Sequence, residues 1–255
     1  MKISLENQVA VVTGGSRGIG AATVKLFAQT GCNVVFSYFR SARAAREVVE
    51  TCQRSHGSVL AIRADVTKMA DTRKLIEKAI HGFGRLDILV ANAGIWNSDP
   101  ARIDKITERD WDRMVAVNLK GAYSVIRCAV PHMAKQNRGR IVAVSSTAGQ
   151  RGEAFHTHYA AAKGGVISLV KGLAAELAPH NILVNAVAPG WVATDMAKPV
   201  LRKPSEKRRA TSSIPLRRFG RPEEVAMPIL FLASNMSSYM TGEIININGG
   251  NVLCG

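Results

Sequence analysis

Short, almost wholly apolar runs alternate along the chain with longer segments in which apolar residues recur every three or four positions. Wholly apolar runs are typical of parallel β-strands buried on both faces, and the longer recurrence is typical of amphipathic helices. This alternation predicts a single α/β domain with a doubly wound, parallel, seven-stranded sheet. The predicted strands are Val9–Thr13, Asn33–Tyr38, Val59–Arg63, Asp87–Ala91, Gly139–Ser145, Ile182–Ala188 and Glu243–Ile247. The predicted helices are one that contains Ile19, Val24, Leu26 and Phe27, followed by Ala42–Gln53, Met69–Phe83, Glu108–Lys135, His158–Ala178 and Glu223–Ala233.

The longest irregular stretch runs from Pro189 to Pro222 and contains five prolines. Its length and composition predict a loop with short helices rather than a linker. Within it, Lys198–Arg221 holds nine Lys or Arg residues and a single acid, Glu206. This charge either attracts an anionic ligand or only keeps a surface loop solvated, and both interpretations remain open.

Composition narrows the class of protein. The chain has 255 residues, 47% of them apolar, which indicates a globular domain. The apolar runs fall short of the ~18 residues that a membrane span needs, and the amino terminus lacks a secretory signal. The four cysteines show no C-x-x-C spacing. We therefore expect a cytoplasmic protein with reduced thiols. No histidine has the partners of a zinc site, so we expect no metal. The net charge of +15 is compatible with nucleic acid, anionic substrates or a solvated basic surface.

The first predicted strand leads into the sequence TGGSRGIG, residues 13–20, which holds four glycines. A strand, a glycine-rich turn and a helix start can bind phosphate, because the first N–H groups of a helix lack partners and lie at the positive end of its dipole. Gly14 suits the tight turn, Gly18 lets the backbone approach a pyrophosphate, and Gly20 lets the helix pack closely on the strand. An ordinary glycine-rich turn remains the alternative for this motif alone.

Further motifs follow in order across nearly the whole chain. They are Asp65-Val66, NAG at Asn92–Gly94, Asn118 in VNLKG, Ser146 after the fifth strand, Y-x-x-x-K from Tyr159 to Lys163, Pro189-Gly190, and NINGG at Asn246–Gly250. Together with the glycine spacing, this set resembles the short-chain dehydrogenase/reductase family, most closely its 3-oxoacyl-[acyl-carrier-protein] reductase branch. The resemblance implies a Rossmann fold, a substrate lid at about residues 190–221, and a homotetramer. Relatives pair their subunits through the long helices that here start at Glu108 and His158, and through the carboxyl-terminal segment.

The resemblance also implies a nicotinamide dinucleotide whose adenosine ribose lies near the end of the second strand. NAD-preferring relatives place an acid there, whereas no Asp or Glu occurs between Gly31 and Arg46. Guanidinium groups bind phosphate through a planar fork, so the cofactor predicted is NADP(H). A solvated surface position remains the alternative for Arg40. The residues predicted to form the 2′-phosphate pocket are Ser16, Arg17, Arg40 and Ser41. The other implied cofactor contacts are Gly14, Gly18, Ile19, Gly20, Asp65, Val66, Asn92, Gly94, Tyr159, Lys163, Pro189, Gly190, Val192 and Thr194, with a helix cap as the alternative for Asp65.

Tyr159 and Lys163 are four residues apart on a predicted helix and therefore share one face. A neighbouring ammonium favours the phenolate and lowers the tyrosine pKa from about 10, so Tyr159 can exchange a proton with a substrate carbonyl as hydride moves. The resemblance implies that Ser146 polarises that carbonyl, that Lys163 also holds the nicotinamide ribose, and that Asn118 positions a water beside Lys163. Each residue alone has a structural alternative, but the four together predict an oxidoreductase.

Three functions remain open. The first is NADPH-dependent reduction of a 3-oxoacyl thioester on acyl carrier protein, and the second is the same chemistry on a sugar, polyol, steroid or small ketone. The third is a non-enzymatic dinucleotide- or nucleic-acid-binding protein, which is disfavoured because RNA-binding aromatic motifs are missing from the sequence. In the resembled branch two basic residues beside the entrance dock the carrier, and the corresponding positions here hold Asn137, next to Arg138, and His180.

Aromatic and histidine side chains flank the predicted site. Trp96 and Trp191 follow the fourth and sixth strands, so we expect both to line the pocket. Trp111 lies inside a predicted helix and is expected in the core. His156 and His158 precede Tyr159 and are expected to face solvent from a loop.

Overall fold

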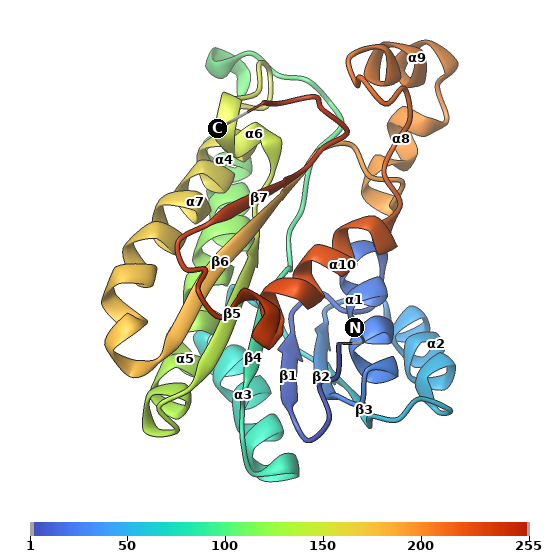
Figure 1. Cartoon of the computed structure of the whole chain (residues 1–255). Helices are drawn as coiled ribbons and strands as arrows, with labels where there is room; N and C mark the ends of the chain where they lie inside the picture. The colour runs from blue at the N-terminus through green and yellow to red at the C-terminus, as the bar shows by residue number, and fades with distance from the viewer. Residues whose placement is uncertain (1–2, 254–255) are drawn as a thin grey trace.

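The computed structural model describes residues 3–253 and shows one all-parallel sheet with the strand order β3-β2-β1-β4-β5-β6-β7 (Figure 1). The predicted doubly wound fold and its seven strands are therefore confirmed. The strands are β1 (Val9–Val12), β2 (Asn33–Tyr38), β3 (Val59–Arg63), β4 (Ile88–Ala91), β5 (Gly139–Val144), β6 (Ile182–Pro189) and β7 (Ile244–Ile247).

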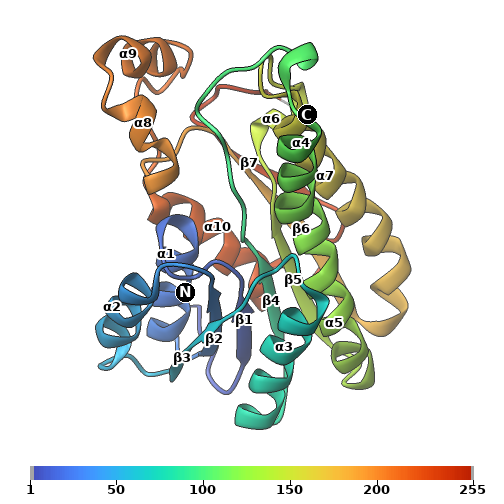
Figure 2. The ribbon, with the colours of Figure 1, turned by 180° about the vertical axis from the view of Figure 1, so that it is seen from behind.

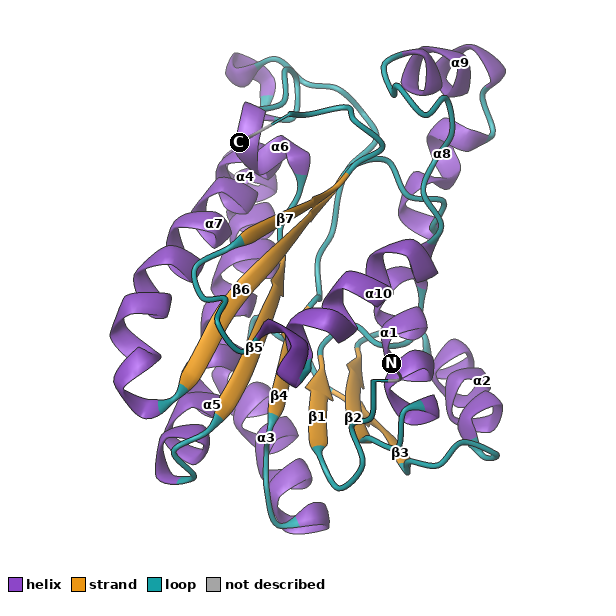
Figure 3. Ribbon diagram, viewed as in Figure 1, coloured by secondary structure: helices purple, strands orange, loops and turns teal. Residues whose placement is uncertain are grey.

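Helices cover both faces of the sheet, which gives the domain three layers (Figures 2 and 3). One face packs against α1 (Gly18–Gln29), α2 (Ala42–Cys52) and α10 (Pro222–Ala233). The other packs against α3 (Met69–Phe83), α5 (Gly121–Lys135) and α7 (Thr157–Leu177). The shorter helices are α4 (Glu108–Val115), α6 (Thr147–Arg151), α8 (Lys198–Leu201) and α9 (Pro204–Ser212), with 3₁₀ turns at Ile103–Lys105, Ala178–His180, Asp195–Ala197 and Asn235–Ser237.

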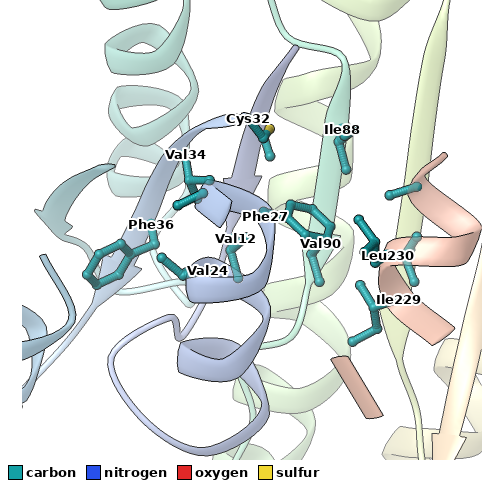
Figure 4. Packing of buried hydrophobic residues seen from close by; sticks show 14 of the residues in the cluster. Val12, Val24, Phe27, Cys32, Val34, Phe36, Ile88, Val90, Ile229 and Leu230 are labelled. Carbon is teal, nitrogen blue, oxygen red and sulfur yellow. The ribbon is translucent and has the colours of Figure 1, made fainter. Parts of the chain in front are cut away.

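The core is two apolar layers, one on each face of the sheet. Successive residues of a strand point to opposite faces, so Ala10 and Val12 of β1 pack on one side while Val9 and Val11 pack on the other. Figure 4 shows the first layer, in which Phe27 of α1 lies against the sheet. Because both faces of each central strand are buried, its sequence is apolar throughout, as the pattern of the chain indicated.

The sheet reverses its winding direction at β1, which pairs with β2 on one side and with β4 on the other. Connections leave the carboxyl ends of β1 and β4 toward opposite faces of the sheet, and this opens a crevice between them. In doubly wound folds ligands bind in this crevice. The fold thus positions a site at the carboxyl ends of the strands.

At the opposite end of the sheet, β1 and β4 are joined through a buried carboxylate. Asp87 is 2% exposed, and its Oδ2 accepts from the backbone N–H of Val9 at 2.9 Å. Its two oxygens also accept from Arg85, from Nε at 2.7 Å and from Nη2 at 2.6 Å. Charge-assisted bonds of this kind are stronger than neutral ones, so they fix the amino ends of the two strands.

Two details of the helices differ from the prediction. The segment expected as one helix, Glu108–Lys135, contains a π-helical turn at Ala116–Lys120 between α4 and α5. Trp111 of α4, expected in the core, is 38% exposed, because α4 buries only Met114. The irregular stretch after β6 forms short helices as expected, and α8 and α9 stand apart from the sheet beyond the carboxyl end of β6 (Figures 1 and 2).

Among residues 3–253, no helix is both long and apolar enough to cross a bilayer. Cys32, Cys52 and Cys128 are free thiols, and Cys254 lies outside the described residues.

Candidate active site

A cavity of about 650 Å³ lies at the carboxyl ends of β1 to β6. Its lining comes from the loops that follow these six strands, so residues far apart in the sequence meet there. Every residue predicted for the cofactor or for catalysis lines this cavity: Gly14, Ser16, Arg17, Gly18, Ile19, Gly20, Arg40, Ser41, Asp65, Val66, Asn92, Gly94, Asn118, Ser146, Tyr159, Lys163, Pro189, Gly190, Val192 and Thr194.

The glycine turn after β1 brings the start of α1 against the cavity. Gly14 has a φ of +67°, which side chains rarely tolerate. A Cβ on Gly20 would lie 2.3 Å from the Gly14 carbonyl oxygen, so only glycine permits this packing of helix on turn. No side chain caps the amino end of α1, whose N-cap is Arg17. The first N–H groups of the helix are therefore available to a phosphate.

Hydroxyl and amide side chains fix the turn in place. Thr13 Oγ1 accepts from the backbone N–H groups of Asn92 and Ala93, both at 3.0 Å. Asn92 Nδ2 in turn donates to the carbonyl oxygens of Thr13 at 2.8 Å and Gly14 at 3.2 Å. These Thr13–Asn92 contacts join the carboxyl ends of β1 and β4 across the crevice. Ser37 Oγ also accepts from the Gly14 N–H at 3.2 Å.

The cavity ends at β2 and β3 with a basic, largely exposed rim. Arg17 pairs with Asp195 at 3.4 Å, and the guanidinium of Arg40 lies 5.3 Å from the ring centroid of Phe39. The basic partners Lys198 and Arg17 lower the pKa of Asp195. Asp65 Oδ1 accepts from the backbone N–H of Thr67 at 3.0 Å and from its hydroxyl at 2.7 Å. These contacts form a local turn before α3, whose N-cap is Lys68 and has no side-chain capping bond, so Asp65 is not the helix cap of its structural alternative; it lines the cavity.

Ser146 and Tyr159 meet at the carboxyl end of β5. Ser146 is the N-cap of α6, and its Oγ accepts from the Ala148 N–H at 3.1 Å. Tyr159 lies in the first turn of α7, half-buried, with its hydroxyl hydrogen-bonded to Ser146. The neighbouring Ser145 instead donates to the carbonyl oxygen of Lys163 at 2.8 Å, which ties α7 to β5. Ser146 therefore contacts Tyr159, whereas Ser145 joins α7 to β5.

Lys163 lies one helical turn after Tyr159 and is 4% exposed. Its Nζ lies 5.9 Å from the centroid of the Tyr159 ring and donates to the carbonyl oxygen of Val144 at 2.8 Å. Asn118, in the π-helical turn, bonds the backbone of Ile95 in both directions and also donates to Met114. A Cβ on Gly94 would lie 2.7 Å from Asn118 Oδ1 and 3.4 Å from Lys163 Nζ, so this glycine lets the two side chains approach each other.

The pKa of Tyr159 shifts in the opposite direction from the one expected beside Lys163. Burial lowers the pKa of Lys163 to about 8. Burial also raises the pKa of Tyr159, and this outweighs the opposite effect of its hydrogen bond to Ser146. The expectation that Lys163 leaves Tyr159 with a lowered pKa is therefore wrong for the protein's own groups. Tyr159 holds its proton at neutral pH and can serve as a proton donor.

An aromatic cluster borders the cavity beyond Tyr159. Trp96 and Trp191 line the cavity as expected and meet edge to face, with ring centroids 5.6 Å apart. His156 stacks on Trp96 at 5.1 Å, and Phe219 lies 5.6 Å from Trp191. We call these four residues the aromatic cluster. The expectation that His156 and His158 face solvent is wrong: they are 9% and 4% exposed, because Trp96 and neighbouring helices cover them.

The two positions that correspond to the carrier-docking residues of the resembled branch lie away from the cavity. Asn137 follows α5, before β5, and His180 ends the turn before β6, so both lie at the amino ends of these strands. The cavity lies at the carboxyl ends, and within one chain these positions are therefore not beside its entrance. Two residues of the site were not predicted: Thr13 and Ser37, whose hydroxyls hold the glycine turn. A hydroxyl residue at or near the end of an otherwise apolar strand is the signal that marks both.

The residues present fit a dinucleotide. They supply a glycine turn, an uncapped helix start and a basic rim, which together suit a pyrophosphate and a further anionic group. Within the described part of the chain, His, Cys, Asp and Glu side chains form no group of three or more that could hold a metal ion.

Known proteins are similar to this chain over nearly its whole length. The family model described as "Enoyl-(Acyl carrier protein) reductase" matches residues 14–251. The 3-oxoacyl-[acyl-carrier-protein] reductase FabG of Thermotoga maritima is 45% identical over 98% of this chain and 99% of its own, and the 3-oxoacyl-[acyl-carrier-protein] reductase of Synechocystis sp. is 40% identical over the same shares.

Solved structures extend the likeness to three dimensions. A dehydrogenase/reductase from Sinorhizobium meliloti 1021 superposes with a TM-score of 0.90 at 34% identity, covering 98% of this chain and 97% of that one. A short-chain type dehydrogenase/reductase from Mycobacterium marinum gives 0.91 at 33% identity, covering 98% of both chains. Since these likenesses extend over nearly the whole length and include the fold, the chain belongs to the short-chain dehydrogenase/reductase family of enzymes.

Proposed function

We propose that this protein is an NADPH-dependent 3-oxoacyl thioester reductase of the 3-oxoacyl-[acyl-carrier-protein] reductase type. The observation that carries the proposal is the arrangement at the end of β5, where the Tyr159 hydroxyl bonds Ser146 beside the buried ammonium of Lys163. The names of relatives 40–45% identical over almost the full chain support the acyl substrate. A reductase of a sugar, polyol, steroid or small ketone would use the same groups.

The cofactor site extends from the glycine turn to Lys163. The N–H groups at the start of α1 bind the pyrophosphate, Arg17 and Arg40 bind the 2′-phosphate, and Lys163 binds the nicotinamide ribose. When bound, the nicotinamide supplies the hydride that the reaction requires. The rim contains Arg17 and Arg40, and its carboxylates already have partners: Asp195 pairs with Arg17, and Asp65 accepts from the backbone N–H and the hydroxyl of Thr67. That balance favours a phosphorylated ribose over a free 2′-hydroxyl.

Tyr159 and Ser146 act on the substrate carbonyl. The Ser146 hydroxyl donates to the carbonyl oxygen and stabilises the negative charge that develops there as hydride adds to carbon. The phenol of Tyr159 then transfers its proton to this oxygen, which completes the alcohol. Because its pKa is raised, Tyr159 holds that proton at neutral pH and is in the form that carbonyl reduction requires. Lys163, next to the Tyr159 ring, stabilises the phenolate that remains.

Replacing the phenol separates chemistry from binding. Tyr159→Phe is expected to lower kcat for acetoacetyl thioester reduction by at least about 100-fold, the usual contribution of general acid catalysis, while NADPH affinity stays unchanged. Tyr123→Phe, which alters a tyrosine on α5 that is 43% exposed and outside the cavity, is the matched control. Retention of most of kcat by Tyr159→Phe contradicts the mechanism, and absence of thioester reduction by the wild-type enzyme contradicts the proposed substrate.

We further propose a cytoplasmic homotetramer and acyl carrier protein as the partner that presents the substrate. The tail from Met240 to Leu253 carries no charge after Glu243, and Leu253 is 89% exposed, as expected of a segment that packs on another subunit. The last two residues of the segment expected to pair subunits lie outside the described residues. Sedimentation at the monomer mass across micromolar concentrations would contradict the tetramer.

A further inference from the structure

Two indole rings close the substrate side of the cavity. Trp96 follows β4 and Trp191 follows β6, and both line the cavity. Their centroids are 5.6 Å apart, and the ring planes are nearly perpendicular, at 89°. Since β5 lies between β4 and β6 in the sheet, the indole pair spans the carboxyl end of β5, where Ser146 lies. The pair is therefore a wall next to the reacting carbonyl.

A second layer of rings holds this wall in position. His156 stacks on Trp96 with an interplanar angle of 27°, and Phe219 packs on Trp191 with an angle of 54°. His156 and Phe219 are 9% and 8% exposed and do not line the cavity. Neither indole can move away from the cavity without leaving its partner ring, and such ring pairs are favourable beyond the area that they bury.

The segment that follows β6 supports the wall as well. Ala197, Val200 and Ala210 form a separate small apolar cluster with Phe219, and the two indoles pack against it. The indole pair thus lies between the cavity and helices α8 and α9. An outward movement of either ring is opposed on this side by packed side chains rather than by solvent.

The space that remains for a substrate is small. The cavity volume of about 650 Å³ is within the usual range for a single ligand of drug size, roughly 300–1,000 Å³. The loops after β1, β2 and β3 line the cofactor side, together with Pro189, Gly190, Val192 and Thr194 after β6. A dinucleotide along that lining leaves only the end bordered by Tyr159 and the indole pair.

From these observations we propose that Trp96 and Trp191 determine specificity by ending the acyl subsite, so that the enzyme accepts short 3-oxoacyl groups and discriminates against long ones. In addition, we infer that His156 is a positioning residue that holds Trp96 in the wall. The inference rests on the proposed function, because it concerns the acyl part of that substrate. The reductase activity alone does not require such a limit on the length of the acyl chain.

Chain length is the variable that tests the wall. The probes are the N-acetylcysteamine thioesters of 3-oxobutanoate and 3-oxooctanoate, reduced by the full-length enzyme with saturating NADPH. In a closed apolar subsite each misplaced methylene changes kcat/KM by roughly tenfold or more, so the wild type should prefer the short thioester by at least about tenfold. Trp96→Ala and Trp191→Ala should each reduce this preference to about threefold or less, mainly through a lower KM for the long thioester.

Three further variants distinguish an effect on the indole wall from a general loss of folding or activity. His156→Ala, which removes the stack, should shift the length preference as Trp96→Ala does, and His156→Phe, which keeps a ring there, should restore it. A role in folding alone would instead change kcat for both thioesters equally. Trp111→Ala removes an exposed tryptophan outside the cavity and should leave the preference unchanged. Circular dichroism melting identifies any variant that has failed to fold.

The outcomes distinguish the two proposals. If the wild type reduces neither thioester, the proposed function fails and the inference fails with it. If it reduces both equally well, or if both folded tryptophan variants keep the wild-type preference, the proposed function stands and the wall is refuted. A shift with the tryptophan variants but not with His156→Ala refutes only the positioning role of His156.

Discussion

Reversing one charge at the basic rim should change the cofactor preference. Arg40→Asp removes the guanidinium that we propose binds the 2′-phosphate, and a hydrogen bond between charged groups contributes about 1.5–3 kcal/mol. Arg40 is exposed, so we use the lower end of that range. The introduced carboxylate adds repulsion of about 1 kcal/mol if it lies ~4 Å from the phosphate in water. The sum of about 2–3 kcal/mol corresponds to a rise in the Kd of NADPH of roughly 30- to 150-fold.

The same substitution should spare NADH or improve its binding, because a carboxylate can accept a hydrogen bond from the free 2′-hydroxyl. Fluorescence titration of both nucleotides measures this without any assumption about the substrate. Arg43→Asp is the matched control: it makes the same charge change three residues later, in the first turn of α2, at a side chain that is 89% exposed, pairs with Glu47 and does not line the cavity. Equal losses for NADPH and NADH, or an equal effect of Arg43→Asp, would refute the assignment of Arg40.

The remaining predictions concern stability and recruitment. Burial lowers the folded-state pKa of Lys163 to about 8, below its unfolded-state value, so the stability that this residue contributes grows between pH 8 and 10. In urea unfolding, the wild type should therefore gain stability relative to Lys163→Met over this range. Asp87→Ala removes the hydrogen bonds of a buried carboxylate to Val9 and Arg85. Because the remaining Arg85 side chain is 44% exposed and can be solvated, the free energy of unfolding should fall by about 1.5–3 kcal/mol, as measured with urea at pH 7. If the positive charge of α9 recruits an anionic substrate, the double variant Arg208→Gln, Arg209→Gln should have a lower kcat/KM for a coenzyme A thioester at low salt but not for a neutral diketone. Equal changes in kcat/KM for both substrates would show that this charge does not recruit substrate.

The sheet and the cofactor side of the cavity were predictable because local sequence determines them. A glycine that must adopt a positive φ, such as Gly14, marks a turn wherever it stands, and apolar runs mark strands buried on both faces. The loops of a doubly wound sheet then meet at the carboxyl ends of the strands. Knowledge of the strand order is thus enough to bring Tyr159, Ser146 and Asn92 into one site.

The errors concern properties that depend on packing between distant segments. Helical periodicity places Trp111 on one face of α4 but does not say whether another element covers that face, and none within the described chain does so fully. His156 lies in a loop, yet Trp96, sixty residues earlier in the chain, covers it. The expected direction of the Tyr159 pKa was wrong for the same reason, since burial by the folded chain raises this pKa by more than the hydrogen bond to Ser146 lowers it.

The Thr13–Asn92 contacts have a consequence for how this scaffold can diverge. They hold the nucleotide side of the crevice through backbone groups and through side chains at strand ends, none of which belongs to the aromatic cluster. Substitutions at Trp96, Trp191 or Phe219 alter the substrate side while these contacts remain intact. Selection for a new substrate can therefore proceed by single replacements that keep hydride chemistry functional at every step, and a mutant library confined to those positions should yield altered specificities far more often than inactive proteins.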